Sequence, residues 1–212
     1  METPNKYWQI DAASSLQALL DDAACPPLLG GVLGGLPWQT RNEKTVAALL
    51  RAPRTAPLWT AALLALGAEV VLEDDTVTPL ASPGQGKGQS TPVALRLPRR
   101  EGQRWGIARV ARTPADEPIV AAVAVVELAE GMVQAARLAL AGAWPEPARL
   151  AQAAAQLVGG PLDAASIAAT AAAIEAEVEP EGDWLGSAAY RRAMASVLAR
   201  RALEACLKEG EG

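Results

Sequence analysis

The second half of the sequence alternates between β-rich and helical segments in a way that leaves few architectures open. Three stretches rich in Val, Ile, Leu and Ala come first, at residues 104–112, 119–128 and 132–140. The last two are joined by Ala129–Glu130–Gly131, a tight turn that suits an antiparallel hairpin. Helices are then predicted at 146–158, at 161–178 and from 187 to about 208. A three-stranded antiparallel sheet packed on a three-helix bundle makes a compact α+β unit.

The first half is predicted to hold a small mixed or antiparallel sheet with helices. A strand is expected at residues 7–10, a hairpin at 69–80 and a further strand at 92–97. Ser14 is the predicted N-cap of the first helix, with Gln17 completing a capping box. Asp163 and Ser187 are the predicted N-caps of two later helices. Because the pattern changes after residue 101, we expect two domains, 1–101 and 102–212.

Two glycine pairs, Gly30–Gly31 and Gly34–Gly35, invite comparison with nucleotide-binding loops. Their spacing is not G-x-G-x-x-G and no strong strand precedes them. We therefore favour a short helix whose small residues let another backbone pass closely. Gly86–Lys87 is followed by a glycine and lacks the earlier glycine at Walker spacing, so no phosphate loop is expected there.

The composition excludes several kinds of chemistry. The sequence has no histidine, which removes imidazole acid–base catalysts, Ser–His triads and His-ligated zinc. The two cysteines, Cys25 and Cys206, are expected to be buried, reduced thiols, and are too few for an iron–sulfur cluster. We therefore single out no catalytic residue and no metal ligand. Any redox chemistry must come from a bound organic cofactor or from a partner.

Charge and hydropathy narrow the range of partners. The net charge is −5, and neither half offers the basic surface that nucleic-acid binding needs. The longest apolar run, at residues 119–127, is too short to span a bilayer. The N-terminus lacks the basic-then-apolar pattern of a signal peptide. We expect a cytoplasmic protein with neither nucleic-acid nor membrane partners.

Two segments of the second half resemble motifs of a known family. AGAWPEPARLAQAAAQLVGGPLD (141–163) resembles the run GGVAP-x-P-x-R-A…E-x-x-L-x-G. DWLGSAAYRRAMASVLARRALEA (183–205) resembles D-x-x-a-S-x-x-Y-R-x-x-x-a-x-x-L-x-R-R-a-L. These motifs are those of the FAD-binding medium subunit of molybdenum hydroxylases, the family of xanthine dehydrogenase and the carbon monoxide dehydrogenase flavoprotein. The resemblance implies that residues 102–212 are like the C-terminal domain of that flavoprotein.

The first half resembles the same family, beginning part-way through its FAD-binding domain. RNEKTVAALLRAPRTAPLWTAALLALGA (41–68) resembles R-N-x-G-T-i-G-G-N-l…S-P-x-x-D-x-x-P-x-l-l-A-L-g-A. Residues 1–101 are therefore expected to be a remnant of that domain, its second subdomain. The family's first subdomain, with a Gly-rich loop around the FAD pyrophosphate, has no counterpart in the sequence. If FAD is retained, the resemblance implies that Arg41, Asn42, Thr45 and Val46 contact it.

The same segment departs from the family where the cofactor is expected to lie. Ala47, Ala48 and Leu49 replace Gly-Gly-Asn, and Leu58 replaces an Asp. A Cβ obstructs close approach of the backbone to phosphates. A leucine leaves polar groups of the ligand without partners, at about 1–3 kcal/mol each. We therefore expect a closed apolar surface, lost FAD binding, and a structural role in the turn for the four retained residues.

Two functions from different classes remain in view. In the first, the chain is a non-catalytic scaffold with no expected cofactor. It would dock onto a molybdopterin-containing large subunit, an iron–sulfur subunit or both, within a hydroxylase-type oxidoreductase complex. In the second, FAD occupies a residual cleft between the domains and carries electrons from an iron–sulfur partner to an acceptor. Trp38, Trp59 and Trp105 would then offer stacking surfaces. A free-standing small-ligand binder is a third alternative.

Overall fold

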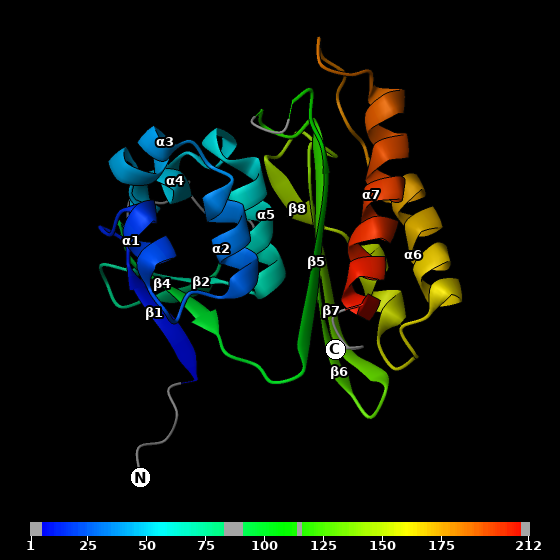
Figure 1. Cartoon of the computed structure of the whole chain (residues 1–212), viewed down its shortest axis with the longest axis horizontal. Coiled ribbons are helices and arrows are strands. Elements are labelled where there is room, and N and C mark those ends of the chain that lie inside the picture. The colour runs from blue at the N-terminus through cyan, green and yellow to red at the C-terminus, as the bar shows by residue number, and fades with distance from the viewer. Residues whose placement is uncertain (1–5, 83–90, 114–115, 209–212) are drawn as a thin grey trace.

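The computed structural model describes residues 6–82, 91–113 and 116–208. It contains two antiparallel four-stranded sheets, with strand orders β1-β4-β2-β3 and β5-β6-β7-β8 (Figure 1). The first sheet consists of β1 (Tyr7–Asp11), β2 (Glu69–Leu72), β3 (Val77–Pro79) and β4 (Pro92–Pro98). The second consists of β5 (Gln103–Val110), β6 (Val120–Ala129), β7 (Met132–Ala141) and β8 (Ala148–Leu150). The predicted α+β class is confirmed.

The helices fall into two groups on either side of the second sheet (Figure 1). The first group consists of α1 (Leu16–Asp21), α2 (Pro27–Gly34), α3 (Trp38–Glu43), α4 (Val46–Arg51), the 3₁₀ helix η1 (Pro53–Thr55) and α5 (Pro57–Leu66). The second group consists of the 3₁₀ helix η2 (Gln152–Leu157), α6 (Ala164–Glu177) and α7 (Ala188–Lys208). Helix α5 packs on β6, β7 and β8, and α7 packs on β5 and β6 from the opposite side. The second sheet is therefore the middle layer of the molecule.

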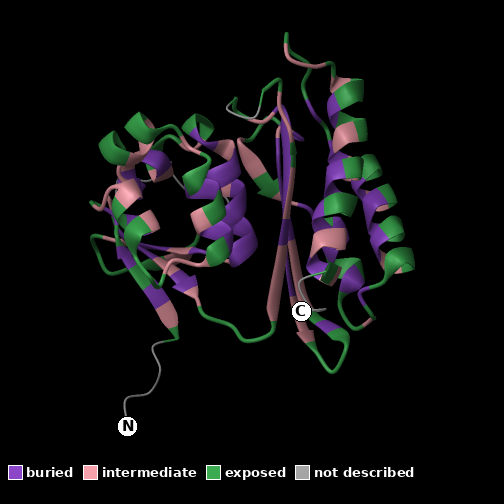
Figure 2. Cartoon of the chain, in the orientation of Figure 1, coloured by how far each residue is buried: buried purple, intermediate pink, exposed green. Residues whose placement is uncertain are grey.

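Strand β6 is buried on both faces from Val120 to Val126, which explains the uninterrupted apolar sequence of this part of the strand (Figure 2). One set of alternate residues joins the core that includes α5, namely Ala121, Val123 and Val125. The other set joins the core that includes α6 and α7, namely Val120, Ala122, Ala124 and Val126. Because successive side chains of a strand point to opposite faces, a strand between two cores must be apolar throughout.

Close packing of α7 on the sheet depends on Gly106 of β5. A Cβ at this position would collide with the backbone carbonyl of Ala202 and lie 2.7 Å from the Cβ of Ala205. The absence of a side chain therefore lets the helix backbone rest directly on the strand.

The second half differs from the prediction in two details. The expected three-stranded sheet has a fourth strand, β8, and the expected first helix of the bundle is the 3₁₀ helix η2. Pro147 disfavours a helical conformation of the residue before it. The N–H of Ala151 donates to the carbonyl of Leu138 in β7 at 2.8 Å, which continues the sheet beyond β8. Pairing with β7 thus replaces the first turns of the predicted helix.

The N-caps predicted for the two α-helices of this half are confirmed. The carboxylate of Asp163 accepts the N–H of Ser166 at 2.8 Å at the start of α6. The hydroxyl of Ser187 accepts the N–H of Tyr190 at 3.1 Å at the start of α7.

In the first half, the strands and the hairpin are confirmed, and the glycine pairs lie in and directly after the short helix α2. The expected close approach of another backbone is wrong, because a Cβ on Gly31 or Gly34 would meet nothing within 4 Å. The first helix is capped by Ser15, whose hydroxyl accepts the N–H of Ala18 at 3.1 Å, and not by Ser14. Gly86–Lys87 lies outside the described residues.

Candidate functional site

The segment expected to meet FAD is joined by its backbone to the start of α1. Val46 donates its N–H to the carbonyl of Ser14 at 3.1 Å, and Ala47 donates its N–H to the carbonyl of Ala12 at 2.8 Å. Because the carbonyl of Ser14 accepts the N–H of Val46, it is not available to α1, and Ser15 caps the helix instead. Two N–H groups at the N-terminus of α4 therefore point at the protein's own backbone.

The other N–H groups of this first turn are also satisfied within the chain. The hydroxyl of Thr45 accepts the N–H of Ala48 at 3.2 Å, and the carbonyl of Thr45 accepts the N–H of Leu49 at 3.2 Å. A helix N-terminus binds an anion through N–H groups that have no partner within the protein. The first turn of α4 keeps none of these groups available.

The four residues expected to contact FAD occupy separate environments. Arg41 donates from Nη1 to the carbonyl of Gly34 at 3.0 Å, and this bond links α3 to the end of α2. Asn42 donates from Nδ2 to the carbonyl of Trp38 within α3, at 2.9 Å. Val46 is fully buried. The bonds formed by Arg41, Asn42, Thr45 and Val46 all fix the backbone around α3 and α4, and their role toward a cofactor stays a prediction.

Most of the residues that replace the family's Gly-Gly-Asn and Asp are buried. Leu49 is 1% exposed, and Ala47 and Leu58 are each 9% exposed. Ala48 is half-buried. Leu49 and Leu58 both belong to the core formed by the first sheet, its helices and β6 and β7. These side chains are thus occupied in packing.

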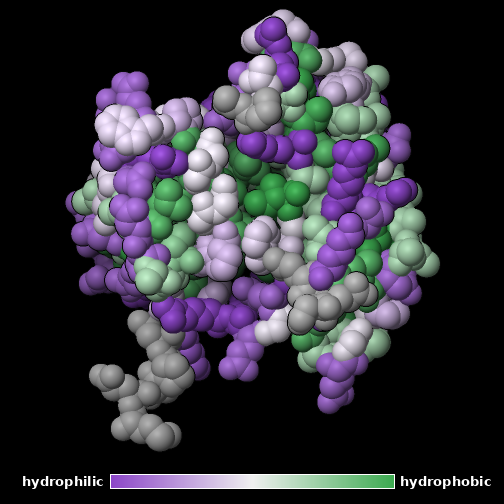
Figure 3. All heavy atoms as spheres, in the orientation of Figure 1, coloured by the Kyte–Doolittle hydropathy of each residue, from purple (hydrophilic) through white to green (hydrophobic). Residues whose placement is uncertain are grey.

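A hollow of about 250 Å³ lies where the first sheet, α5 and β5 meet. Its apolar wall and its polar rim are formed by Trp8, Ala24, Pro26, Leu66, Leu97, Pro98, Arg99, Arg100 and Gln103. The Nε2 atom of Gln103 is buried and has no hydrogen-bond partner among the described residues. Space-filling spheres show apolar side chains gathered in the furrow between the two halves, with hydrophilic ones along its borders (Figure 3). None of the four residues expected to contact FAD lines the hollow.

Arg100, which lines the hollow, takes part in one of two ion pairs formed by Glu127. Glu127 of β6 accepts from Arg100 at 2.7 Å and from Arg137 of β7 at 3.0 Å. Burial alone would raise the pKa of Glu127, but the hydrogen bonds and charges of the two guanidinium groups outweigh it and lower the pKa. Arg137 also lies against Gly67, the C-cap of α5, where a cation is favourable to the helix dipole.

The tryptophans named as stacking surfaces do not line the hollow. Trp38 is 71% exposed on α3, and Trp59 is 1% exposed in the core. Trp105 is half-buried in β5. Trp8, which the sequence reasoning did not single out, contributes instead and donates from Nε1 to Asp22 at 3.0 Å. Only the alternation of β1 marks Trp8 in the sequence, and that alternation indicates a core residue.

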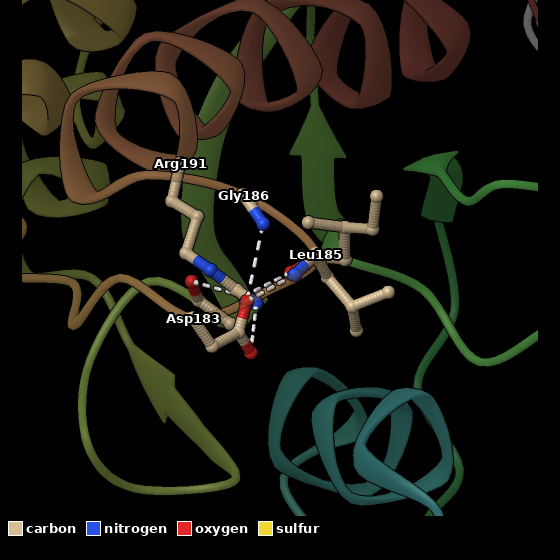
Figure 4. A network of polar contacts seen from close by, with 6 residues as sticks. Asp183, Leu185, Gly186 and Arg191 are labelled. Carbon is tan, nitrogen blue, oxygen red and sulfur yellow. Dashed lines mark hydrogen bonds and ion pairs between the residues drawn. The ribbon is translucent and has the colours of Figure 1, made fainter.

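A network of polar contacts in the second half involves residues of the DWLGSAAYRR motif (Figure 4). Arg191 is 7% exposed, and it donates to the carbonyl of Ile119 at 2.6 Å and to Asp183 at 2.7 Å. The other carboxylate oxygen of Asp183 accepts the N–H groups of Leu185 and Gly186 at 2.9 and 3.1 Å. The hydrogen bond from Arg191 is the main cause that lowers the pKa of Asp183. This network fixes the turn that precedes α7.

The two thiols have different surroundings. Cys206 is buried, as expected, whereas Cys25 is only half-buried and its expected burial is wrong. Burial, followed by the charge of Asp22, raises the pKa of Cys25 to about 11. Across the described ranges, no group of three His, Cys, Asp or Glu residues could hold a metal ion. In those same ranges, no helix combines the length and the apolar character that crossing a membrane requires.

Comparison with known proteins gives one match by sequence and several by structure. Residues 107–206 match the family model described as the CO dehydrogenase flavoprotein C-terminal domain. A search of curated protein sequences finds no match.

Three solved structures illustrate the likeness in fold. Carbon monoxide dehydrogenase from Hydrogenophaga pseudoflava is similar with a TM-score of 0.85 and 24% identity, over 98% of this chain and 77% of that chain. Reconstituted CO dehydrogenase from Oligotropha carboxidovorans gives 0.82 and 24%, over 95% and 76%. Quinoline 2-oxidoreductase from Pseudomonas putida 86 gives 0.81 and 22%, over 98% and 77%. At these identities the likeness establishes a common fold.

Proposed function

We propose, from the match of residues 107–206 to the family model described as the CO dehydrogenase flavoprotein C-terminal domain, that the chain is a non-catalytic subunit of a molybdenum hydroxylase-type oxidoreductase complex. In this proposal the chain has lost FAD binding and acts as a scaffold. It docks onto a molybdopterin-containing large subunit, an iron–sulfur subunit or both. The matched family model is the one that the sequence motifs of the second half indicated.

The observation that carries the proposal is the closed first turn of α4. Its N–H groups are used by Ala12, Ser14 and Thr45, so a phosphate or ribityl oxygen would have to displace existing hydrogen bonds. Each group left without a partner costs about 1–3 kcal/mol. Two such losses correspond to about one to four powers of ten in the dissociation constant, at about 1.4 kcal/mol for each power.

The size of the hollow supports the same proposal. Ligand sites for molecules of cofactor size usually measure about 300–1,000 Å³ and enclose most of the ligand. The hollow beside Gln103 measures about 250 Å³, and the expected cofactor residues lie elsewhere. The small volume of this hollow supports the proposed loss of FAD binding.

Cofactor analysis of the purified protein tests the proposal. The protein would be isolated from its native host and its flavin absorbance compared with its concentration, before and after denaturation. We expect no bound flavin. Stoichiometric flavin in the native protein would refute the loss of FAD binding.

The alternative is an FAD-binding electron-transfer subunit that uses the hollow as part of a residual cleft. The specific observation in its favour is the buried Nε2 of Gln103, which lacks a partner among the described residues and could donate to a ligand. Titration with FAD while following Trp fluorescence separates the two functions. Quenching at micromolar FAD that is weakened in Gln103→Leu would favour the alternative, and no quenching at tens of micromolar counts against it.

The scaffold function also predicts which partners bind this chain. A tagged chain, recovered under native conditions, is expected to bring molybdenum and iron with it in fixed proportions. Recovery of the chain free of both metals would refute the assignment to such a complex, whatever its flavin content.

A further inference from the structure

The hollow beside Gln103 has a wall of core side chains. Trp8, Leu66 and Leu97 line it, and all three are buried in the core that includes the first sheet and α5. The volume of the hollow is about 250 Å³. An apolar cavity of about 150 Å³ is enough to hold benzene. The hollow therefore has room for a molecule with a single ring and one small polar group.

The side chain of Gln103 brings an unused hydrogen-bond donor to the hollow. Gln103 is the first residue of β5, and its Nε2 is buried without a partner among the described residues. A buried donor that lacks an acceptor costs free energy, and most such groups in proteins are paired. An oxygen atom of a bound molecule would supply the acceptor. The amide therefore indicates that the polar group of the ligand carries an oxygen.

Arg99 adds a positive charge to the exposed rim of the hollow. Its guanidinium forms no ion pair with any residue in the described ranges. Arg100, which also lines the hollow, is held by Glu127 at 2.7 Å. A guanidinium binds a planar carboxylate through two parallel hydrogen bonds, which makes this anion its best geometric match. The free cation of the rim thus favours a carboxylate.

The carboxylates near the hollow limit the charge of the ligand. Glu127 is already shared by two guanidinium groups. Asp22 accepts the N–H of Ala24 at 2.8 Å and the indole N–H of Trp8 at 3.0 Å, and these bonds lower the pKa of Asp22 and keep it ionised. The charge of Arg99 lowers that pKa further, although the two side chains form no ion pair. Because Asp22 repels anions, a single negative charge fits this hollow better than the double charge of a phosphate.

We propose that the hollow binds a small monocarboxylate with a single ring, its ring on the apolar wall and its carboxylate bound by Arg99 and by the amide Nε2 of Gln103. A ring is favoured over a flexible chain because it has fewer rotatable bonds to immobilise on binding. The site lies within this chain alone, so the proposal does not depend on the scaffold function.

Calorimetric titration of the purified full-length chain tests the ligand class, with benzoate as the probe. We expect a dissociation constant below about 1 mM for benzoate. Benzamide, which has the same shape without the charge, hexanoate and inorganic phosphate should each bind at least about 10-fold more weakly. Binding of any of the three as tight as that of benzoate, or no binding of benzoate, would overturn the proposal. Binding of FAD by a chain that does not bind benzoate would favour the FAD-binding alternative instead.

Variants of the two polar residues test the place of binding. Arg99→Ala and Gln103→Leu should each weaken benzoate binding about 10-fold, because each removes a donor to the carboxylate. Arg51→Ala is the matched control, since Arg51 is an exposed arginine at the end of α4 that does not line the hollow. Unchanged affinity in both Arg99→Ala and Gln103→Leu would place the ligand elsewhere and contradict the proposal.

A second measurement locates the ligand in the wild type and does not depend on the stability of Arg99→Ala or Gln103→Leu. In the nitrogen-15-labelled chain, the indole N–H signal of Trp8 is assigned by its loss in Trp8→Phe. This signal should shift when benzoate is added, because Trp8 lines the hollow. The signals of Trp38 and Trp184, which are exposed elsewhere, should stay in place. A Trp8 signal that does not move at saturating benzoate would overturn the proposed site, whatever the stoichiometry of binding.

Discussion

Arg191 is the buried charge that holds three segments of the second half together. Its guanidinium reaches the carbonyl of Ile119 before β6, the carbonyl of Gly142 after β7 and the carboxylate of Asp183. The side chain of Asp183 is 44% exposed, so water can solvate its charge if the arginine is removed. The two carbonyls lie deeper, and the loss of their shared donor is the larger cost.

Replacement of this arginine tests that balance. Arg191→Met is expected to lower the free energy of unfolding by about 2 kcal/mol, the cost of leaving buried acceptors without a donor. Arg191→Lys keeps the charge but cannot reach all acceptors with one ammonium group, so a smaller loss is expected. Urea denaturation measures both. Surface substitutions typically change the free energy of unfolding by less than about 0.5 kcal/mol. A change this small in Arg191→Met would contradict the structural role of Arg191.

The ion pairs of Glu127 predict a dependence of stability on pH. The pKa of this carboxyl is lower in the folded protein than its ordinary value of 4.5. The ionised group therefore stabilises the fold above pH 4.5, and this contribution is lost as the pH falls through the folded pKa. Glu127→Gln should be less stable than the wild type at pH 7, and the difference should shrink on acidification.

Thermal unfolding of the wild type and Glu127→Gln across a pH series measures that difference. Glu204→Gln is the control, because Glu204 forms an exposed pair with Arg200 on α7 at 2.8 Å and such pairs contribute little. A constant gap between the wild type and Glu127→Gln at every pH would refute the role of the two arginines.

At the residue scale, prediction from sequence succeeded where the deciding contact is local. Asp163 caps α6 through a residue three positions away, and the sequence indicated it. The cap of α1 is Ser15 and not the predicted Ser14, because the carbonyl of Ser14 accepts the N–H of Val46, a residue far along the chain. The same long-range pairing closes the first turn of α4. No local pattern carries that information.

At the scale of elements, the close packing of α7 on β5 depends on a single glycine, Gly106. Gly106→Ala is expected to lower the free energy of unfolding by at least about 2 kcal/mol, since the Cβ meets a backbone carbonyl that cannot move without shifting α7. Gly31→Ala, in the interior of α2 and facing open space, should raise it by about 0.5–1 kcal/mol.

Chemical denaturation measures the free energy of unfolding of both variants. Because each variant adds the same methyl group, a difference between them reports the surroundings of the two glycines. Equal effects would mean that the helix does not rest on the strand at Gly106. The glycine pairs drew attention in the sequence, yet the critical position is the glycine of β5. Spacing along the chain marks glycines that follow a motif, whereas the approach of α7 arises only in the folded molecule.

The strands were easier to predict than the elements beside them. The β6–β7 hairpin follows from its own turn, where Glu130 and Gly131 adopt φ values of 52° and 78°. Strand β8 exists because it pairs with β7, and its sequence, with proline close by, resembles the start of a helix. The cover of α5 over β6 was likewise missed, because an apolar strand does not reveal how many of its faces are buried.

At the scale of the whole molecule, the second sheet serves two cores at once. The core on one side includes α5 and the first sheet, and the core on the other side includes α6 and α7. The division into residues 1–101 and 102–212 stays a prediction about the chain. The shared sheet implies that the two parts support each other, because removing the first would expose the face of β6 that α5 covers.

We therefore predict that the protein unfolds as one cooperative unit. Val123 faces the core of α5, and Val126 faces the core of α7. Val123→Ala and Val126→Ala should each destabilise the molecule by about 2 kcal/mol, from lost burial and the cavity left behind. Hydrogen exchange followed by mass spectrometry should show that each variant lowers protection in β1 and β4 as much as in β6 and β7. If Val126→Ala weakened protection in the second sheet alone, the two halves would unfold independently, and β6 would be a boundary between them instead of a shared layer.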